Sequence, residues 1–138
     1  MRDGMDVALC VFEDGANVVQ FAGAINPLYV VRDGMLIQSK GNRFSIGSYF
    51  DNKFRPFTNQ ESDLQSGDVL YMFSDGYADQ FGGDSDRKMS QRVFREILLD
   101  IHHLPLAEQK EELLRRLREW QKNAPQTDDI CIIGIKIS

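Results

Sequence analysis

Residues 67–79 of the chain read GDVLYMFSDGYAD, and this stretch contains a strand that ends at an acidic residue. The polar residues 65–68, QSGD, are typical of a turn. Residues 69–74 follow as a mostly apolar run rich in aromatic side chains, which predicts a short buried strand. Asp75 comes directly after this run, and Gly76 allows the backbone to turn sharply there. The stretch therefore predicts a strand that places a carboxylate at its C-terminal end.

The sequence before this strand has the pattern of antiparallel strands joined by short turns. Residues 5–12 are apolar on both faces, which predicts a strand buried on both sides. The turn at Glu13-Asp14-Gly15 pairs it with a second strand over residues 17–22. Two further strands, residues 28–32 and 35–39, flank Asp33-Gly34, a strong hairpin signal. We expect residues 46–56 to form a loop or an irregular edge.

The sequence after residue 79 changes to helical periodicity. Ser90 can cap a helix that extends to Ile101, and Pro105 suits the first turn of another that ends near Gln121. The second helix is expected to bury Leu106, Leu113, Leu117 and Trp120. Residues 80–89 are interpreted as a mobile polar loop, either beside a substrate entrance or a simple linker, and residues 130–137 as a final strand.

Strands, then two helices, then one more strand predict an α+β fold. The expected architecture is an antiparallel β-sandwich with antiparallel helices on one face. The 138 residues suffice for one ordinary domain, and no repeat or linker divides them.

The composition excludes some classes of function. The net charge of −5 disfavours nucleic-acid binding, which requires basic patches. No apolar run approaches the roughly 18–20 residues of a membrane span, so we expect no membrane contact and a cytoplasmic location. Cys10 and Cys131 lie in apolar runs and are expected to be small, reduced, buried residues.

A second acidic motif, Thr127-Asp128-Asp129, precedes the last strand. Adjacent carboxylates repel, and a divalent cation beside them reduces that repulsion. Aspartate oxygens without cysteine or paired histidine suit Mg²⁺ or Mn²⁺ rather than Zn²⁺. Asp75 and Asp128 could therefore share one cation, although each motif alone is more typical of a surface turn.

Four segments together resemble one family. Residues 3–10 (DGMDVALC), 21–28 (FAGAINPL), 67–79 and 126–133 (QTDDICII) are similar, in the same order, to the metal-dependent serine/threonine phosphatases of the PPM family. The likeness is to the bacterial branch of the stage II sporulation phosphatase E (SpoIIE). It spans nearly the whole chain and implies that residues 1–138 are the C-terminal part of one phosphatase domain, incomplete at the N-terminus.

The resemblance assigns roles residue by residue. Asp75 and Asp128 match metal-ligand aspartates, and Asp129 matches a neighbouring position that holds Asn or Asp. Gly76 and Gly23 match positions that shape the backbone near the site. No catalytic side chain beyond the metal ligands is implied.

The family's activity is implied for the intact protein. Two Mn²⁺ or Mg²⁺ ions would generate a metal-bound hydroxide that attacks the phosphorus of phosphoserine or phosphothreonine. The implied substrate is a regulatory protein of the anti-anti-sigma type, and the implied setting is the cytoplasmic part of a larger sensor.

The sequence departs from the family pattern because two upstream metal motifs are absent. His102 and His103 lie at a predicted helix end and do not replace them. We therefore expect weak or absent metal binding and little activity for this chain alone, and self-association through a truncated face. Two other interpretations stay open: a non-catalytic interaction or regulatory domain with a phosphatase-like fold, and a β-sandwich without a site, in which Asp75 and Asp128 lie far apart.

Overall fold

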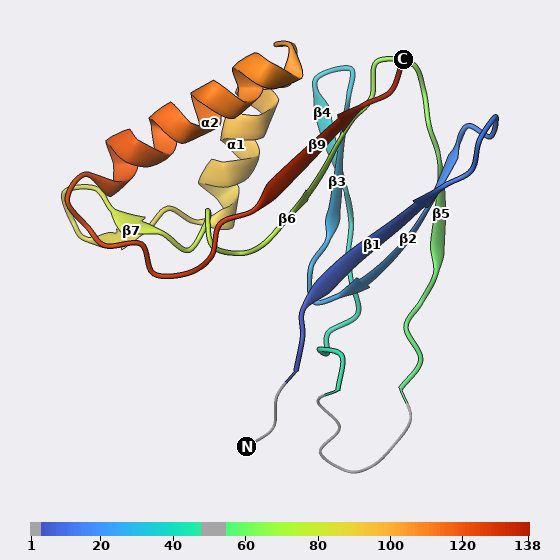
Figure 1. The fold of residues 1–138 in the computed structure, drawn as a ribbon, viewed down its shortest axis with the longest axis horizontal. Helices are drawn as coiled ribbons and strands as arrows, with labels where there is room; N and C mark the ends of the chain where they lie inside the picture. Colours follow the sequence, from blue (N-terminus) through green and yellow to red (C-terminus); the bar gives the residue numbers. More distant parts are fainter. Residues whose placement is uncertain (1–3, 48–54) are drawn as a thin grey trace.

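A computed structural model describes residues 4–47 and 55–138 of the chain. Two antiparallel sheets face each other, and two helices cover the outer side of one of them (Figure 1). The predicted α+β sandwich with helices on one face is therefore confirmed. Asp3 and most of the loop expected at residues 46–56 lie outside the described residues.

The smaller sheet has the strand order β1-β2-β5. Its strands are β1 (Val7–Phe12), β2 (Val18–Ala24) and β5 (Gln60–Asp63). The expectation that the first strand is buried on both sides is wrong, since Leu9 is 58% and Val11 is 47% exposed. β1 is an edge strand whose outer face has no layer over it in the described part of the chain. Its inner face packs on the core between the sheets, where Val19, Phe21, Leu28 and Leu70 meet.

The larger sheet has the strand order β4-β3-β6-β9. Its strands are β3 (Leu28–Arg32), β4 (Met35–Ser39), β6 (Val69–Phe73) and β9 (Ile132–Lys136). The predicted hairpin at Asp33-Gly34 is present, with φ angles of 50° and 75° that match a two-residue turn. β6 lies between β3 and β9. Because β6 and β9 are antiparallel, the C-terminal end of β6 lies beside the N-terminal end of β9.

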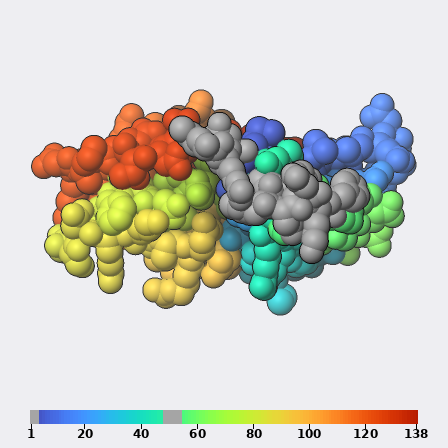
Figure 2. Space-filling view, turned by 90° about the horizontal axis from the view of Figure 1, so that it is seen from below, coloured from blue at the N-terminus to red at the C-terminus, as the bar shows by residue number. Residues whose placement is uncertain are grey.

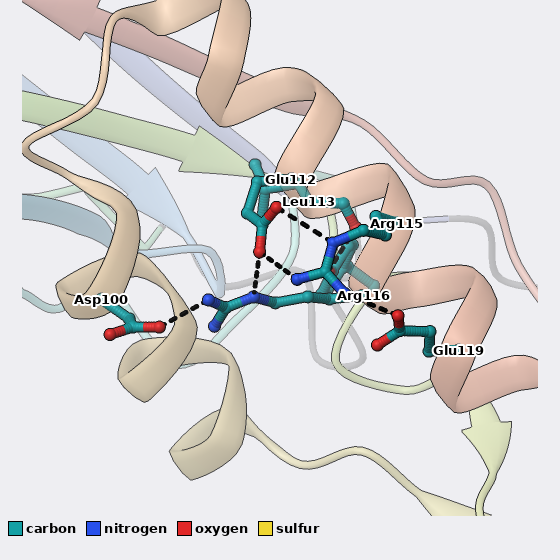
Figure 3. Close-up of polar contacts among 7 residues, drawn as sticks. Asp100, Glu112, Leu113, Arg115, Arg116 and Glu119 are labelled. Atoms are coloured by element: carbon teal, nitrogen blue, oxygen red, sulfur yellow. Dashed lines mark hydrogen bonds and ion pairs between the residues drawn. The ribbon is translucent and has the colours of Figure 1, made fainter.

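The two helices form the third layer. α1 (Gln91–Ile101) begins at Ser90, whose Oγ accepts a hydrogen bond from the Val93 N–H, and α2 (Leu106–Gln121) follows a short turn. The expected burial is confirmed for Leu113 and Leu117, but Leu106 at the helix start is 38% exposed. Charged side chains tie the helices together, because Arg116 of α2 contacts both Asp100 of α1 and Glu112 of its own helix (Figure 3).

Residues 80–89 contain regular structure, whereas a polar loop was expected there. They contain a small hairpin, β7 (Phe81–Gly82) and β8 (Arg87–Lys88). The Trp120 Nε1–H donates to the Gln80 carbonyl at 2.8 Å, and a Cβ on Gly82 would lie 2.1 Å from the Trp120 carbonyl oxygen. The hairpin is thereby fastened to α2, at the helical end of an elongated molecule (Figure 2). None of the helices in the described ranges is long and apolar enough to cross a membrane.

A buried ion pair holds the turn before β6. Asp68 is 1% exposed, and the Arg32 guanidinium donates to its two carboxylate oxygens at 2.9 and 2.7 Å. The Gln65 N–H adds a third hydrogen bond at 2.8 Å. These bonds, led by the one from Arg32, hold the pKa of Asp68 below its usual value.

Replacing Asp68 by Asn is expected to lower the free energy of unfolding at pH 7 by about 2 kcal/mol, because Arg32 loses its partner. The folded-state pKa of Asp68 is lowered, so its stabilisation exists above the unfolded-state pKa of about 4 and disappears as the pH falls through the folded-state value. Urea unfolding at several pH values should therefore show the two proteins converging in acid. Asp14→Asn, in an exposed turn, is the control, and equal stability at pH 7 would contradict the prediction.

Candidate metal centre

The turn after β6 presents Asp75 at the protein surface. Asp79 N–H donates to the Asp75 carbonyl at 2.9 Å, which closes one helical turn. Behind it, Tyr77 is 2% exposed, and its hydroxyl donates to the Leu113 carbonyl of α2 at 2.7 Å. The turn is thus anchored to the helical layer on one side while Asp75 remains exposed on the other.

Ser74 connects this turn to the segment before β9. Its N–H donates to the Cys131 carbonyl at 3.0 Å, and its Oγ accepts from the Cys131 N–H at 3.1 Å. The same Oγ donates to the Asp129 carbonyl at 2.9 Å. One backbone bond and two bonds of the Ser74 side chain thus continue the β6–β9 pairing and bring the two acidic motifs together.

Gly76 is required by the closeness of the two segments. A Cβ at this position would lie 2.1 Å from the Asp129 carbonyl oxygen and 2.8 Å from the Asp129 carbonyl carbon. Both are backbone atoms, so any larger residue must push the segments apart. The predicted role of Gly76 in shaping the backbone near Asp75 thus has a geometric basis.

Asp75 and Asp128 lie on segments that approach each other closely, at Gly76 and at the hydrogen bond from Ser74 to the Asp129 carbonyl. The pKa of Asp75 is raised by partial desolvation, by the charges of Asp79 and Asp128, and by a hydrogen bond with Asp128. The Asp128 carboxylate accepts a hydrogen bond from the Asp129 N–H at 2.7 Å. The backbone carbonyl of Asp128 accepts one from Gln126 Nε2 at 2.8 Å. The interpretation without a site predicted widely separated carboxylates, and that separation is not found.

The other acidic residues differ in what they contribute. Asp129 supplies its backbone carbonyl to Ser74, and the carboxylates that act on Asp75 are those of Asp79 and Asp128. Asp79 was not identified from the sequence, although its spacing of one helical turn from Asp75 was a usable sign. It also lies 3.7 Å from Lys88 Nζ of β8, which partly offsets its charge.

The residues present fit a hard cation as a partial set of ligands. The charges of Asp79 and Asp128 raise the pKa of Asp75, and a divalent cation beside Asp75 would offset that repulsion. Mg²⁺ is commonly held by one or two carboxylates together with water or phosphate oxygens. Residues 4–47 and 55–138 nevertheless contain no group of three or more acidic, histidine or cysteine side chains arranged to hold a metal.

Gly23 lies in β2 and acts on a neighbouring part of the surface. A Cβ there would lie 2.3 Å from the Asn26 carbonyl oxygen and 2.9 Å from the Gly41 Cα. The Gly23 carbonyl accepts from the Asn42 N–H at 2.8 Å. Gly23 therefore allows the turn after β2 and the segment after β4 to approach closely.

The two cysteines are less buried than their apolar surroundings suggested. Cys10 is half-buried, and burial raises the pKa of its thiol to about 11. Cys131 is exposed next to Ser74, because it lies before β9 begins.

Comparison with known proteins places the chain in a family. The family described as stage II sporulation protein E (SpoIIE) matches residues 3–138. A comparison with curated protein sequences gives no match.

Solved structures share the fold of this chain. The SiaA-PP2C domain of Pseudomonas aeruginosa is 33% identical, with a TM-score of 0.88 over 96% of this chain and 52% of that chain. The phosphatase domain of the cell fate determinant SpoIIE from Bacillus subtilis has a TM-score of 0.66 at 13% identity, over 96% of this chain and 58% of that one. The catalytic domain of the Mycobacterium tuberculosis phosphatase PstP, solved with two manganese ions, has a TM-score of 0.63 at 17% identity, over 98% and 60%. The chain therefore spans little more than half the length of these relatives.

Proposed function

The chain belongs to the SpoIIE family of PP2C-type (PPM) phosphatases, and from this premise we propose that it supplies the Asp75–Asp128 half of a phosphatase metal centre. The observation that carries the proposal is the close approach of the segments that hold these two carboxylates, at the adjoining ends of β6 and β9. Asp129 is proposed as a weaker ligand beside Asp128, and Gly76 and Gly23 as the residues that permit the close backbone packing.

The proposed reaction is removal of phosphate from a phosphoserine or phosphothreonine of a regulatory protein, with an anti-anti-sigma type protein as the proposed class. Bound Mn²⁺ or Mg²⁺ supplies positive charge that favours ionisation of water near neutral pH and offsets the negative charge of the phosphate. The chain's own residues hold Asp75 and Asp128 at the surface, where a phosphorylated side chain can approach. Ser74 fixes the distance between the two segments through its hydrogen bonds to Asp129 and Cys131.

We further propose that the chain by itself has little phosphatase activity. Two carboxylates provide too few ligands to hold a metal pair, and the described ranges contain no larger cluster. The same observation favours the second candidate function, a phosphatase-like interaction or regulatory domain. The two candidates differ in whether a cation binds at Asp75 and Asp128.

Calorimetric titration with Mn²⁺ tests the metal centre directly. The chain is expected to bind one ion weakly, with a dissociation constant on the order of 1 mM, because few protein ligands are present. Asp75→Asn and Asp128→Asn are each expected to weaken binding by about tenfold or more, since an amide lacks the carboxylate charge. Asp86→Asn, in the exposed β7–β8 turn, serves as the matched control. Equal binding by all four proteins would exclude Asp75 and Asp128 as ligands.

A further inference from the structure

A cavity of about 410 Å³ has Asp75 in its lining, which includes neither Asp79 nor Asp128. Its walls come from the turn after β2, the segment after β4 and the start of α1. The residues that matter most for its chemistry are Lys40, Arg43, Gln91 and Arg95, together with Asp75 and the ring of Tyr29. A space of this size accommodates one or two side chains of a bound peptide.

The cavity is cationic although the chain as a whole has a net charge of −5. Lys40, Arg43 and Arg95 line it, and within the described ranges none of the three forms an ion pair with a carboxylate. By contrast, Arg32, Arg92, Arg115 and Arg116 all have acidic partners. Asp75 is the one carboxylate among the described lining residues. A concave wall with unpaired cations attracts anionic ligands.

Tyr29 lines the cavity, and its buried hydroxyl makes long hydrogen bonds. Tyr29 is 1% exposed, and its hydroxyl donates to Gln91 Oε1 at 3.4 Å and accepts from Arg95 Nη1 at 3.5 Å. Both contacts are long for hydrogen bonds, so these groups can reorient toward a closer partner. The Arg95 guanidinium is suited to a bidentate contact with a carboxylate.

The part of the cavity lining that comes from the turn after β2 is held in place by backbone hydrogen bonds. Asn26 N–H donates to the Ala24 carbonyl at 2.8 Å across Ile25, whose φ of 68° is strained for a β-branched residue. Ile25 N–H in turn donates to the Asn42 carbonyl at 2.8 Å, which fixes this turn against the segment that carries Arg43. A strained backbone held by its surroundings is a common feature of binding sites.

We propose that this cavity binds an acidic segment of the phosphorylated substrate, with carboxylate side chains of that peptide contacting Arg43 and Arg95. The inference rests on the proposed function, because Asp75 belongs to both the metal centre and the cavity wall. It adds a specificity to that function: substrates with Asp or Glu close to the phosphorylated residue are favoured over neutral ones. The cations also offset the repulsion between an acidic enzyme and an acidic substrate.

The experiment uses fluorescence anisotropy of dye-labelled peptides with the full chain, in a chelator so that no divalent cation takes part. Three peptides of equal length are compared: a phosphoserine peptide with acidic flanks, the same peptide without phosphate, and a phosphoserine peptide with Asn and Gln flanks. Both acidic peptides are expected to bind at least about tenfold more tightly than the neutral-flank peptide, and binding should weaken with added salt.

Substitutions of the cavity arginines test whether the difference in peptide affinity arises at the cavity. Arg43→Gln and Arg95→Gln are each expected to weaken binding of the acidic peptides by about tenfold, whereas Arg43→Lys should retain part of the affinity. Arg92→Gln is the matched control, since Arg92 lies on the same helix as Arg95 but pairs with Glu96 at 3.3 Å. Thermal unfolding of each variant verifies that the fold is kept.

The outcomes separate this inference from the proposed function. Equal binding of acidic-flank and neutral-flank peptides, or unchanged binding in both arginine variants, would overturn the inference. Displacement of the phosphopeptides by inorganic phosphate, without binding of the unphosphorylated acidic peptide, would also overturn it, because the cavity would then be a phosphate site. Failure of Mn²⁺ to bind at Asp75 and Asp128 would overturn the metal centre and leave the peptide result intact.

Discussion

Replacing Asp75 by Asn, in a longer protein that joins this chain to the family's upstream metal motifs, is expected to lower kcat/KM for a phosphoserine peptide by more than about 100-fold. Asparagine has nearly the same shape as aspartate, so the turn anchored by Tyr77 should stay in place. The change removes the charge that the proposed cation requires. Steady-state hydrolysis with Mn²⁺ present measures the effect.

Asp128→Asn is expected to give a loss of similar size, because the Asp128 carboxylate acts on Asp75 and belongs to the same proposed metal centre. The double variant should be little worse than either single variant, since residues that serve one site are not additive. Asp86→Asn should retain full activity. Activity that survives in both single variants would show that the two carboxylates do not take part in the reaction.

Gly76→Ala is expected to have the largest effect on stability, a loss of about 3 kcal/mol in the free energy of unfolding. The added methyl group would meet the Asp129 carbonyl oxygen at 2.1 Å. That carbonyl is also held by Ser74 Oγ, so relief of the clash requires breaking the contact between the two acidic segments. Chemical unfolding measures the loss of stability. Mn²⁺ titration of the folded variant measures whether moving the two acidic segments apart weakens metal binding.

Gly134→Ala is the matched control for this substitution. Gly134 lies in β9, and a Cβ there would approach Leu106 Cδ2 no closer than 3.4 Å, an ordinary contact. Its stability should change by less than about 0.5 kcal/mol. Equal stability of the Gly76 variant and the original chain would mean that the two segments can move apart at little cost.

The elements with strong local patterns were predictable from the sequence. The Asp33-Gly34 hairpin, the helix capped by Ser90 and the strand before Asp75 each have short-range determinants, and all three are present. Residue type and position left the proximity of Asp75 and Asp128 open, and the family resemblance then supported it. Composition and spacing could not bring two distant motifs together, because the pairing of β6 with β9 is a long-range interaction.

The features that were missed depend on tertiary contacts. The β7–β8 hairpin is polar and short, and it is ordered by Trp120 and Gln80 rather than by its own sequence. β5 has the sequence QESD, which has low strand propensity, yet it pairs with β2 in register. Arg43 and Arg95 of the cationic cavity come from separate elements, so no local sequence pattern predicts the cavity.

The two acidic segments adjoin through neighbouring antiparallel strands, while the whole helical layer lies between them in the sequence (Figure 1). The spacing of the carboxylates is therefore independent of the length of that connection. The exposed turn between β7 and β8, at residues 84–86 of this connection, is a position where chain can be added or a further module inserted without altering the register of β6 and β9. Divergence in size among homologues, and engineered fusions that respond to new inputs, are most readily accommodated at this point of the fold.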